Sequence, residues 1–115
     1  MASERMRRVD EAVRQVLADA IAEELKDPRV GFVTVTDVTT NPDLRSARVY
    51  VSVLGDAQAR EDSLAGLRHA HGYLQGRLAT ELALRRTPTL EFLYDDTTDR
   101  AMRVEDLLRA EEGTR

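Results

Sequence analysis

The sequence predicts an α+β fold in which helices cover one face of a three-stranded sheet. Three observations lead to this prediction. Two segments, one at the N-terminus and one over residues 64–82, repeat apolar residues at helical spacing. Two β-branched segments lie between them, and a short third strand pattern follows a proline. The expected order is helix, strand, strand, helix, kink, helix, strand, with a short helix near the C-terminus.

The first helix pattern begins after Ser3, a good N-cap residue, and repeats apolar side chains from Met6 to Leu25. We expect this helix to end near Asp27, because Pro28 forbids its continuation. Residues 32–38 are rich in β-branched side chains and predict a strand. Asn41-Pro42-Asp43 has turn chemistry, and residues 47–53 alternate between apolar and polar side chains. The two strands should therefore pair as an antiparallel hairpin.

The leucine-rich pattern over residues 64–82 is interrupted by Ala70-His71-Gly72. A glycine inside a helix costs about 1 kcal/mol relative to alanine, so this tripeptide predicts a bend rather than a straight helix. Pro88 ends the second helix, and residues 90–94 read as the third strand. The helical crossover before it allows this strand to run parallel to the second, but the strand order cannot be read. Two helices meeting at a small-residue kink before a strand are typical of the nucleic-acid-contacting half of a KH-like domain.

A last short helix is expected after Thr97 or Thr98, carrying Ala101, Val104, Leu107 and Leu108. We expect one domain over residues 1–110 and a short flexible acidic tail over residues 111–115. The chain has 115 residues, of which 42% are hydrophobic and 33% charged, which is typical of a soluble globular protein. No apolar run approaches the roughly 20 residues needed to span a bilayer, and the polar N-terminus is no secretory signal. The absence of cysteine excludes disulfides and thiolate chemistry and suits a cytoplasmic protein.

The net charge of −4 at first argues against a nucleic-acid partner. The last 21 residues, however, hold seven acidic residues and four arginines, so the rest of the chain is close to neutral. Between residues 64 and 94, four arginines and two histidines face only two glutamates. Arginine suits bidentate phosphate contacts, although coding bias alone would also explain why Lys26 is the only lysine. The charge pattern permits RNA binding without requiring it.

Several short motifs occur in an order that carries more information than any one of them. Arg8-Val9 opens the first helix and Asp27-Pro28-Arg29 ends it. The strands and the kink contribute Thr34-Val35-Thr36-Asp37-Val38, Asp43-Leu44, Ala47, Val49-Tyr50-Val51-Ser52-Val53, Leu67 and Ala70-His71-Gly72. The third strand is introduced by Leu84-Arg85-Arg86-Thr87-Pro88-Thr89-Leu90-Glu91-Phe92, with Asp95 just beyond. From about Arg5 to Leu108, the chain resembles the ribosome-binding factor A family.

This resemblance implies a KH-like fold of type II, in which an Ala-x-Gly kink replaces the Gly-x-x-Gly loop. It implies a cytoplasmic, monomeric maturation factor that binds free small (30S) ribosomal subunits and their 16S rRNA and assists processing of the rRNA 5′ end. The family is not a nuclease, uses no cofactor, is linked to assembly GTPases and is associated with growth in the cold. The acidic residues 111–115 replace the basic tail that some members carry, so no tail contribution to rRNA affinity is expected.

The small residues of the kink would let an RNA backbone approach closely, and N–H groups at the start of the second helix would face a phosphate. Arginines and histidines near the kink, at the first helix N-terminus and around the hairpin would supply further contacts. The residues predicted to contact RNA are Arg5, Arg7, Arg8, Arg45, Arg68, His69, Ala70, His71, Gly72, Arg77, Arg85 and Arg86. Arg48 is a weaker candidate on the hairpin.

Each of these residues also has a simpler interpretation. The arginines and His69 would be a solvated surface, Gly72 would relieve crowding between crossing helices, and His71 would pack on the leucine stripe. His69 and His71 lie on different helix faces, which is wrong for a shared metal. Asp27-Pro28-Arg29 would simply stop a helix.

Two rival functions remain open. A small α+β domain of net charge −4 would also suit a protein–protein interaction module. Asp95, Asp96 and Asp99 would suit a metal-dependent nuclease, although strand termination and helix capping explain them more simply. The sequence contains no serine–histidine–aspartate arrangement, glycine-rich phosphate loop or metal-ligand spacing. We therefore expect neither catalysis nor a bound metal.

Overall fold

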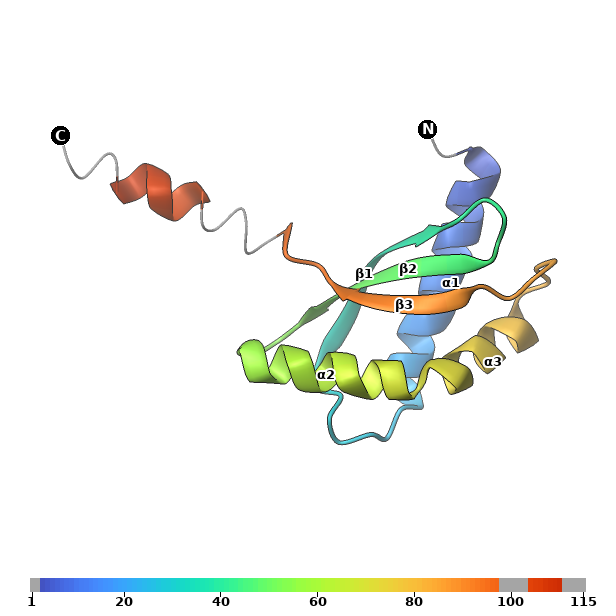
Figure 1. Ribbon diagram of the computed structural model, residues 1–115, viewed down its shortest axis with the longest axis horizontal. Coiled ribbons are helices and arrows are strands. Elements are labelled where there is room, and N and C mark those ends of the chain that lie inside the picture. The colour runs from blue at the N-terminus through green and yellow to red at the C-terminus, as the bar shows by residue number, and fades with distance from the viewer. Residues whose placement is uncertain (1–2, 98–103, 111–115) are drawn as a thin grey trace.

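The computed structural model describes residues 3–97 and 104–110, and its elements follow the predicted order (Figure 1). Residues 104–110 are helical, which confirms the last helix over that range. Thr98, one of its two predicted caps, and the tail over residues 111–115 lie outside the described residues. The remaining elements are α1 (Glu4–Glu23), β1 (Val33–Thr40), β2 (Ser46–Val53), α2 (Ala57–His69), α3 (His71–Glu81) and β3 (Thr89–Tyr94).

Helix α1 begins where the sequence predicts and ends earlier. The Ser3 hydroxyl accepts a hydrogen bond of 3.1 Å from the Met6 N–H, as an N-cap should. The predicted end near Asp27 is wrong, because α1 ends at Glu23. The N–H groups of Glu24 and Leu25 both donate to the Ala20 carbonyl, so the helical bond pattern is lost there. Pro28 therefore marks the last position that a helix could reach rather than its end.

The sheet has the order β1-β2-β3. Strands β1 and β2 pair antiparallel, which confirms the predicted hairpin, and a bulge lies between Val35 and Asp37. Strands β2 and β3 pair in parallel, and the α2–α3 pair forms the crossover between them. The central strand alternates as expected, with Ala47, Val49, Val51 and Val53 buried.

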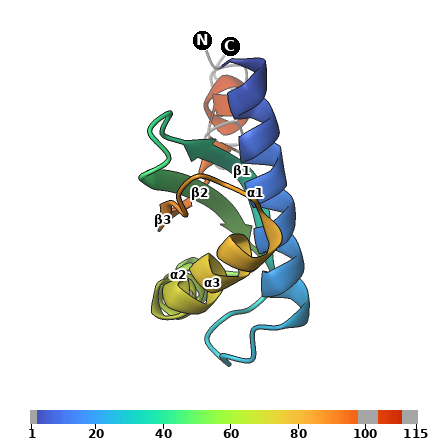
Figure 2. The same ribbon diagram turned by 90° about the vertical axis from the view of Figure 1, so that its right-hand side faces the viewer.

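Helices α1, α2 and α3 lie on one side of the sheet, and the core lies between these two layers (Figure 2). Helix α1 contributes Val13 and Leu17 to this core, and the crossover contributes Leu67, Leu74 and Leu78. Phe92 of β3, which is 1% exposed, closes the core at the sheet edge. Within the described ranges, no helix is long and apolar enough to cross a membrane.

The hairpin turn carries a backbone feature that the sequence does not reveal. The Leu44 N–H donates to the Asn41 carbonyl at 2.8 Å, and Pro42 occupies the second turn position as predicted. Leu44 has a φ of +60°, a conformation that is unfavourable for a side chain with a β-carbon. Its side chain is nevertheless buried, so packing compensates for the backbone cost.

Candidate RNA-binding surface

The predicted kink is a break between two helices that share one residue, Ala70. Its N–H donates to the carbonyls of Gly66 and Leu67 at the end of α2, and its carbonyl accepts from the Leu74 N–H in α3. The methyl side chain of Ala70 cannot accept a hydrogen bond, so α3 has no side-chain N-cap. The first N–H groups of α3 therefore lack the acceptor that most helices provide, and they form a weakly positive helix end.

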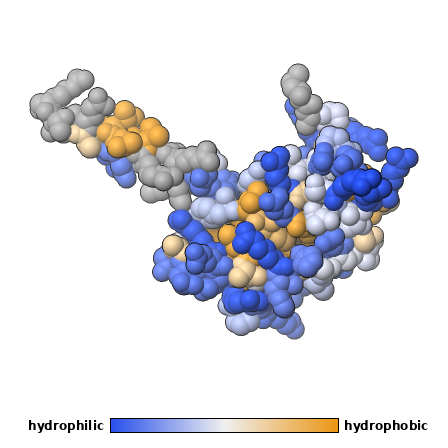
Figure 3. Space-filling model, in the orientation of Figure 1, coloured by the Kyte–Doolittle hydropathy of each residue, from blue (hydrophilic) through white to orange (hydrophobic). Residues whose placement is uncertain are grey.

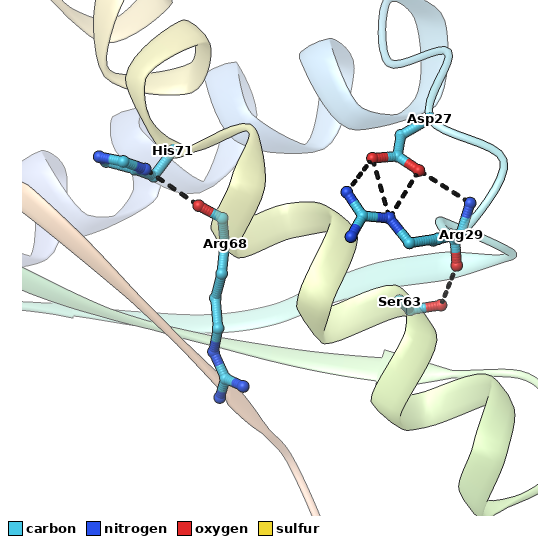
Figure 4. A network of polar contacts seen from close by, with 5 residues as sticks. All are labelled: Asp27, Arg29, Ser63, Arg68 and His71. Carbon is cyan, nitrogen blue, oxygen red and sulfur yellow. Dashed lines mark hydrogen bonds and ion pairs between the residues drawn. The ribbon is translucent and has the colours of Figure 1, made fainter.

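His71 stabilises this break from outside the core. Its Nδ1 lies 2.9 Å from the Arg68 carbonyl oxygen, and because a carbonyl only accepts, the ring donates this hydrogen bond (Figure 4). The interpretation of His71 as a packed residue of the leucine stripe is wrong, since the side chain is exposed. The break at Ala70 shifts the helical phase, so Leu74 and Leu78 continue the buried stripe instead.

Gly72 has no structural need to be glycine. Apart from its two chain neighbours and the backbone of its own helix, no described residue would lie within 4 Å of a β-carbon built on it, and its backbone is not in the left-handed region. The interpretation that Gly72 relieves crowding between helices is therefore wrong. Gly76, one turn later on the same exposed face of α3, is equally open. We did not predict Gly76, although its spacing of four residues from Gly72 was visible in the sequence.

Gly66 shows what a glycine required for packing looks like. A β-carbon there would lie 2.6 Å from Cγ2 of Val30, so α2 and the loop after α1 approach more closely than alanine allows. The same loop is fixed by Ser63, whose hydroxyl accepts from the Gly31 N–H at 3.2 Å. These residues hold the loop beside the C-terminal half of α2, next to the junction.

Asp27 and Arg29 give that loop its shape, which is a role distinct from the helix stop expected for Asp27-Pro28-Arg29. The Asp27 carboxylate accepts from the Arg29 backbone N–H at 2.9 Å and from its guanidinium at 2.7 Å (Figure 4). The side-chain bond to Arg29 is the main cause that lowers the pKa of Asp27 from 3.8 to about 2. Arg29 is thus an arginine near the junction whose charge is already compensated.

Arg68 reaches from α2 to the open edge of the sheet. Its guanidinium donates to the Phe92 carbonyl of β3 at 3.0 Å. Because β3 is an edge strand, this contact satisfies a carbonyl that has no neighbouring strand on that side. Arg68 and its neighbour His69 are both exposed residues. Arg68 therefore has a structural role, and its contact with RNA stays a prediction.

Arg77 belongs to an ion-pair network that joins α3 to the end of α1. It donates to Glu81 within its own helix and lies 3.4 Å from the Glu24 carboxylate. Glu24 also accepts from the Tyr73 hydroxyl. The charge of Arg77 is therefore largely compensated, which makes it the weakest of the predicted contacts near the junction.

The other predicted arginines gather at a different end of the molecule. The start of α1, the hairpin turn and the loop before β3 meet there, and Arg5 and Arg85 line one groove between them. Arg8 and Arg45 each have an acidic neighbour, at 4.0 Å from Glu4 and 3.9 Å from Asp43 respectively. We call this region, with Arg5, Arg7, Arg8, Arg45, Arg85 and Arg86, the arginine end. Figure 3 shows strongly hydrophilic side chains over the hairpin turn and the loop before β3.

The predicted sites thus form two groups rather than one. The junction surface comprises Arg68, His69, Ala70, His71, Gly72 and Arg77, and the arginine end is the second group. The groups are built on different elements, so either one can be altered without changing the other.

Asp95 has a structural partner that the sequence did not suggest. Its carboxylate accepts from the Thr36 hydroxyl at 2.6 Å, and its N–H donates to the Val51 carbonyl. This contact ties the end of β3 to the bulge in β1. Among the described residues, no group of three or more histidine, aspartate or glutamate side chains is placed to hold a metal ion. Asp99 lies outside the described residues.

Comparison with known proteins gives a consistent result. The family model described as Ribosome-binding factor A matches residues 5–108. Proteins named Ribosome-binding factor A from two strains of Desulfitobacterium hafniense are 44% identical over 109 residues, covering 95% of this chain and 87% of theirs.

Solved structures agree with the sequence comparison. The crystal structure of ribosome-binding factor A from Thermus thermophilus is similar with a TM-score of 0.70 and 31% identity, over 77% of this chain and 94% of that one. A homology model of the Thermus thermophilus ribosome-binding factor A, fitted into a cryo-EM map of a 30S–RbfA complex, gives a TM-score of 0.63 and 32% identity, over 75% of this chain and 90% of that one.

Proposed function

Because this chain belongs to the ribosome-binding factor A family, we propose that it binds free small (30S) ribosomal subunits during their late maturation. It acts there without catalysis, by holding one conformation of the 16S rRNA and so assisting processing of the 5′ end. The 30S complex formed by its Thermus thermophilus relative supports the choice of partner. The protein works as a cytoplasmic monomer and is released with the help of assembly GTPases.

The observation that carries this proposal is the free space beside Gly72, where a side chain would fit but the sequence has glycine. A glycine within a helix costs about 1 kcal/mol relative to alanine, and no contact among the residues that the structure describes requires a glycine at position 72. Such a cost is reasonable if an external partner must approach the helix backbone more closely than a side chain permits. The start of α3, which has no side-chain cap, lies at the same place and favours a phosphate group.

The proposal is tested by co-sedimentation with free small subunits and with intact ribosomes over a range of salt concentrations. We expect selective binding to free small subunits that weakens as salt rises, because phosphate contacts release counterions. Gly72→Val should weaken this binding at least tenfold, because the new side chain projects into the space reserved for the RNA, while the protein stays folded.

A matched control is Ala57→Val, which adds the same kind of side chain at an exposed helix position away from the junction. This control should bind like the unmodified protein. Equal binding by Gly72→Val would exclude the junction surface as the contact. No binding to either particle at low salt would instead favour a protein–protein interaction module.

A further inference from the structure

The arginine end contains a groove of about 520 Å³, which none of the residues of the junction surface lines. Its walls come from three segments that are far apart in the sequence: the start of α1, the hairpin turn and the loop before β3. Its volume lies within the range of about 300–1,000 Å³ that is common for sites of small ligands. A groove of this size accepts one flat group or a short extended segment rather than a helix or a duplex.

The lining of the groove combines apolar side chains with two arginines and one carboxylate, that of Asp43, which is paired with Arg45. Met6 and Val9 of α1 and Leu84 of the loop contribute apolar surface, and each is only partly exposed. Arg5 of α1 and Arg85 of the loop before β3 line the groove from different segments of the chain. Within the described part of the chain, neither arginine has an acidic side chain within ion-pair distance, in contrast to Arg8 and Arg45.

The backbone around the groove is held firmly. The Thr89 N–H donates to the Arg45 carbonyl at 2.9 Å, which ties the loop before β3 to the hairpin turn. Leu44 keeps its unfavourable φ of +60° while its buried side chain forms part of the groove lining. Strained residues persist where the surrounding structure fixes them, and they are common at binding sites.

We propose that this groove binds a single unpaired nucleotide of RNA. The base lies on the apolar side chains of Met6 and Val9, and the phosphates on either side contact Arg5 and Arg85. An unpaired base offers a flat apolar face with charged groups close to it, which matches the groove in both size and charge. This inference rests on the proposed RNA-binding function and adds a second contact, away from the junction surface.

The methyl group of Met6 provides a direct test. The chain has three methionines, Met1, Met6 and Met102, so methyl-labelled methionine gives a simple NMR spectrum in which Met6→Leu assigns the signal. We expect a single-stranded RNA hexamer of mixed sequence to shift the Met6 signal upfield through the ring current of a base. An abasic hexamer with the same phosphates should bind through the arginines without that upfield shift.

Substitutions in the groove distinguish the contribution of its arginines from that of its apolar lining. Arg5→Ala combined with Arg85→Ala should reduce the slope of log affinity against log salt by roughly 1.4, the value for two phosphate contacts to a single strand. Ala83→Glu places a carboxylate on the exposed lining and should reduce the Met6 shift at least fivefold. Ala57→Glu, an exposed substitution on α2 outside the groove, should leave it unchanged.

The outcomes distinguish this inference from the proposed function. If the hexamer leaves Met6 unshifted while the protein still binds small subunits, the groove proposal is wrong and the proposed function stands. If the Met6 signal shifts on addition of an acidic peptide with the same charge as the hexamer, but not on addition of the hexamer, the ligand is a protein and the nucleotide proposal is wrong. Gly72→Val should weaken subunit binding at least tenfold yet preserve the Met6 shift, because the junction surface and the groove are built on different elements.

Discussion

Glycine residues in the α2–α3 pair illustrate how the same amino acid serves opposite purposes. Gly66 is buried and lets the loop after α1 pack closely, whereas Gly72 is exposed and no described residue outside its own helix and its chain neighbours would lie within 4 Å of a β-carbon there. Gly72 attracted attention in the sequence because it interrupts a leucine pattern. Gly66 gave no such signal, because its neighbour Val30 lies more than thirty residues earlier in the chain.

Alanine at these two positions should therefore have opposite effects on stability. Gly66→Ala forces Val30 or the loop to move, and overpacking of this kind costs about 1–3 kcal/mol. Gly72→Ala removes backbone freedom from the unfolded chain without a clash, so stability should be unchanged or rise by up to about 1 kcal/mol. Urea unfolding measures both, and a loss of stability in Gly72→Ala would show that this glycine has a structural role after all.

The Asp27–Arg29 pair predicts a specific response to acid. The pKa of Asp27 is about 2 in the folded protein and near 3.8 when unperturbed, so the unfolded state takes up the proton first as pH falls. The pair therefore contributes stability above about pH 4, and this contribution is lost between pH 4 and pH 2. Carboxyl NMR titration should give a midpoint near 2 for Asp27, and Arg29→Ala should return it toward 3.8.

At the scale of elements, local patterns were readable and long-range pairing was not. The Ser3 cap and the alternation of β2 follow from nearest neighbours, and both were predicted correctly. The end of α1 was placed too late, because Pro28 sets only a limit. Glu24 compensates the charge of Arg77, and Arg68 donates a hydrogen bond to β3. Both contacts join separate elements, so the sequence showed these arginines only as basic residues.

The hydrogen bond from Arg68 to the open edge of β3 should make a measurable contribution to stability. Arg68→Ala leaves the Phe92 carbonyl without its donor and should lower the free energy of unfolding by about 1 kcal/mol. Arg85→Ala, an exposed control without such a contact, should change stability little. If Arg68→Ala loses more subunit binding than a variant that is equally destabilised elsewhere, the difference measures the contact of Arg68 with RNA. If Arg68→Ala is as stable as the unmodified protein, Arg68 does not stabilise the edge of β3.

At the scale of the whole molecule, the core that the described residues form ends at β3, before the helix over residues 104–110. The buried core residues that the structure describes lie between Val13 and Phe92. A chain ending at Thr97 should therefore unfold at nearly the same urea concentration as the full chain. A chain ending at Pro88 lacks Leu90 and Phe92 and should not fold cooperatively, which circular dichroism and denaturation would show. A large loss of stability after truncation at Thr97 would mean that later residues pack on the core.

The parallel pairing of β2 with β3 also determines when this protein can become active during its synthesis. The two strands are separated by the whole α2–α3 crossover, so β3 is the last element of the sheet to leave the ribosome that makes it. Until then the helices that present the junction lack their final support, and the loop that carries Arg85 has no anchor at Thr89. Non-local pairing of this kind is slow to form. Under the proposed function, we therefore expect binding to rRNA to begin only when translation of the domain is nearly finished.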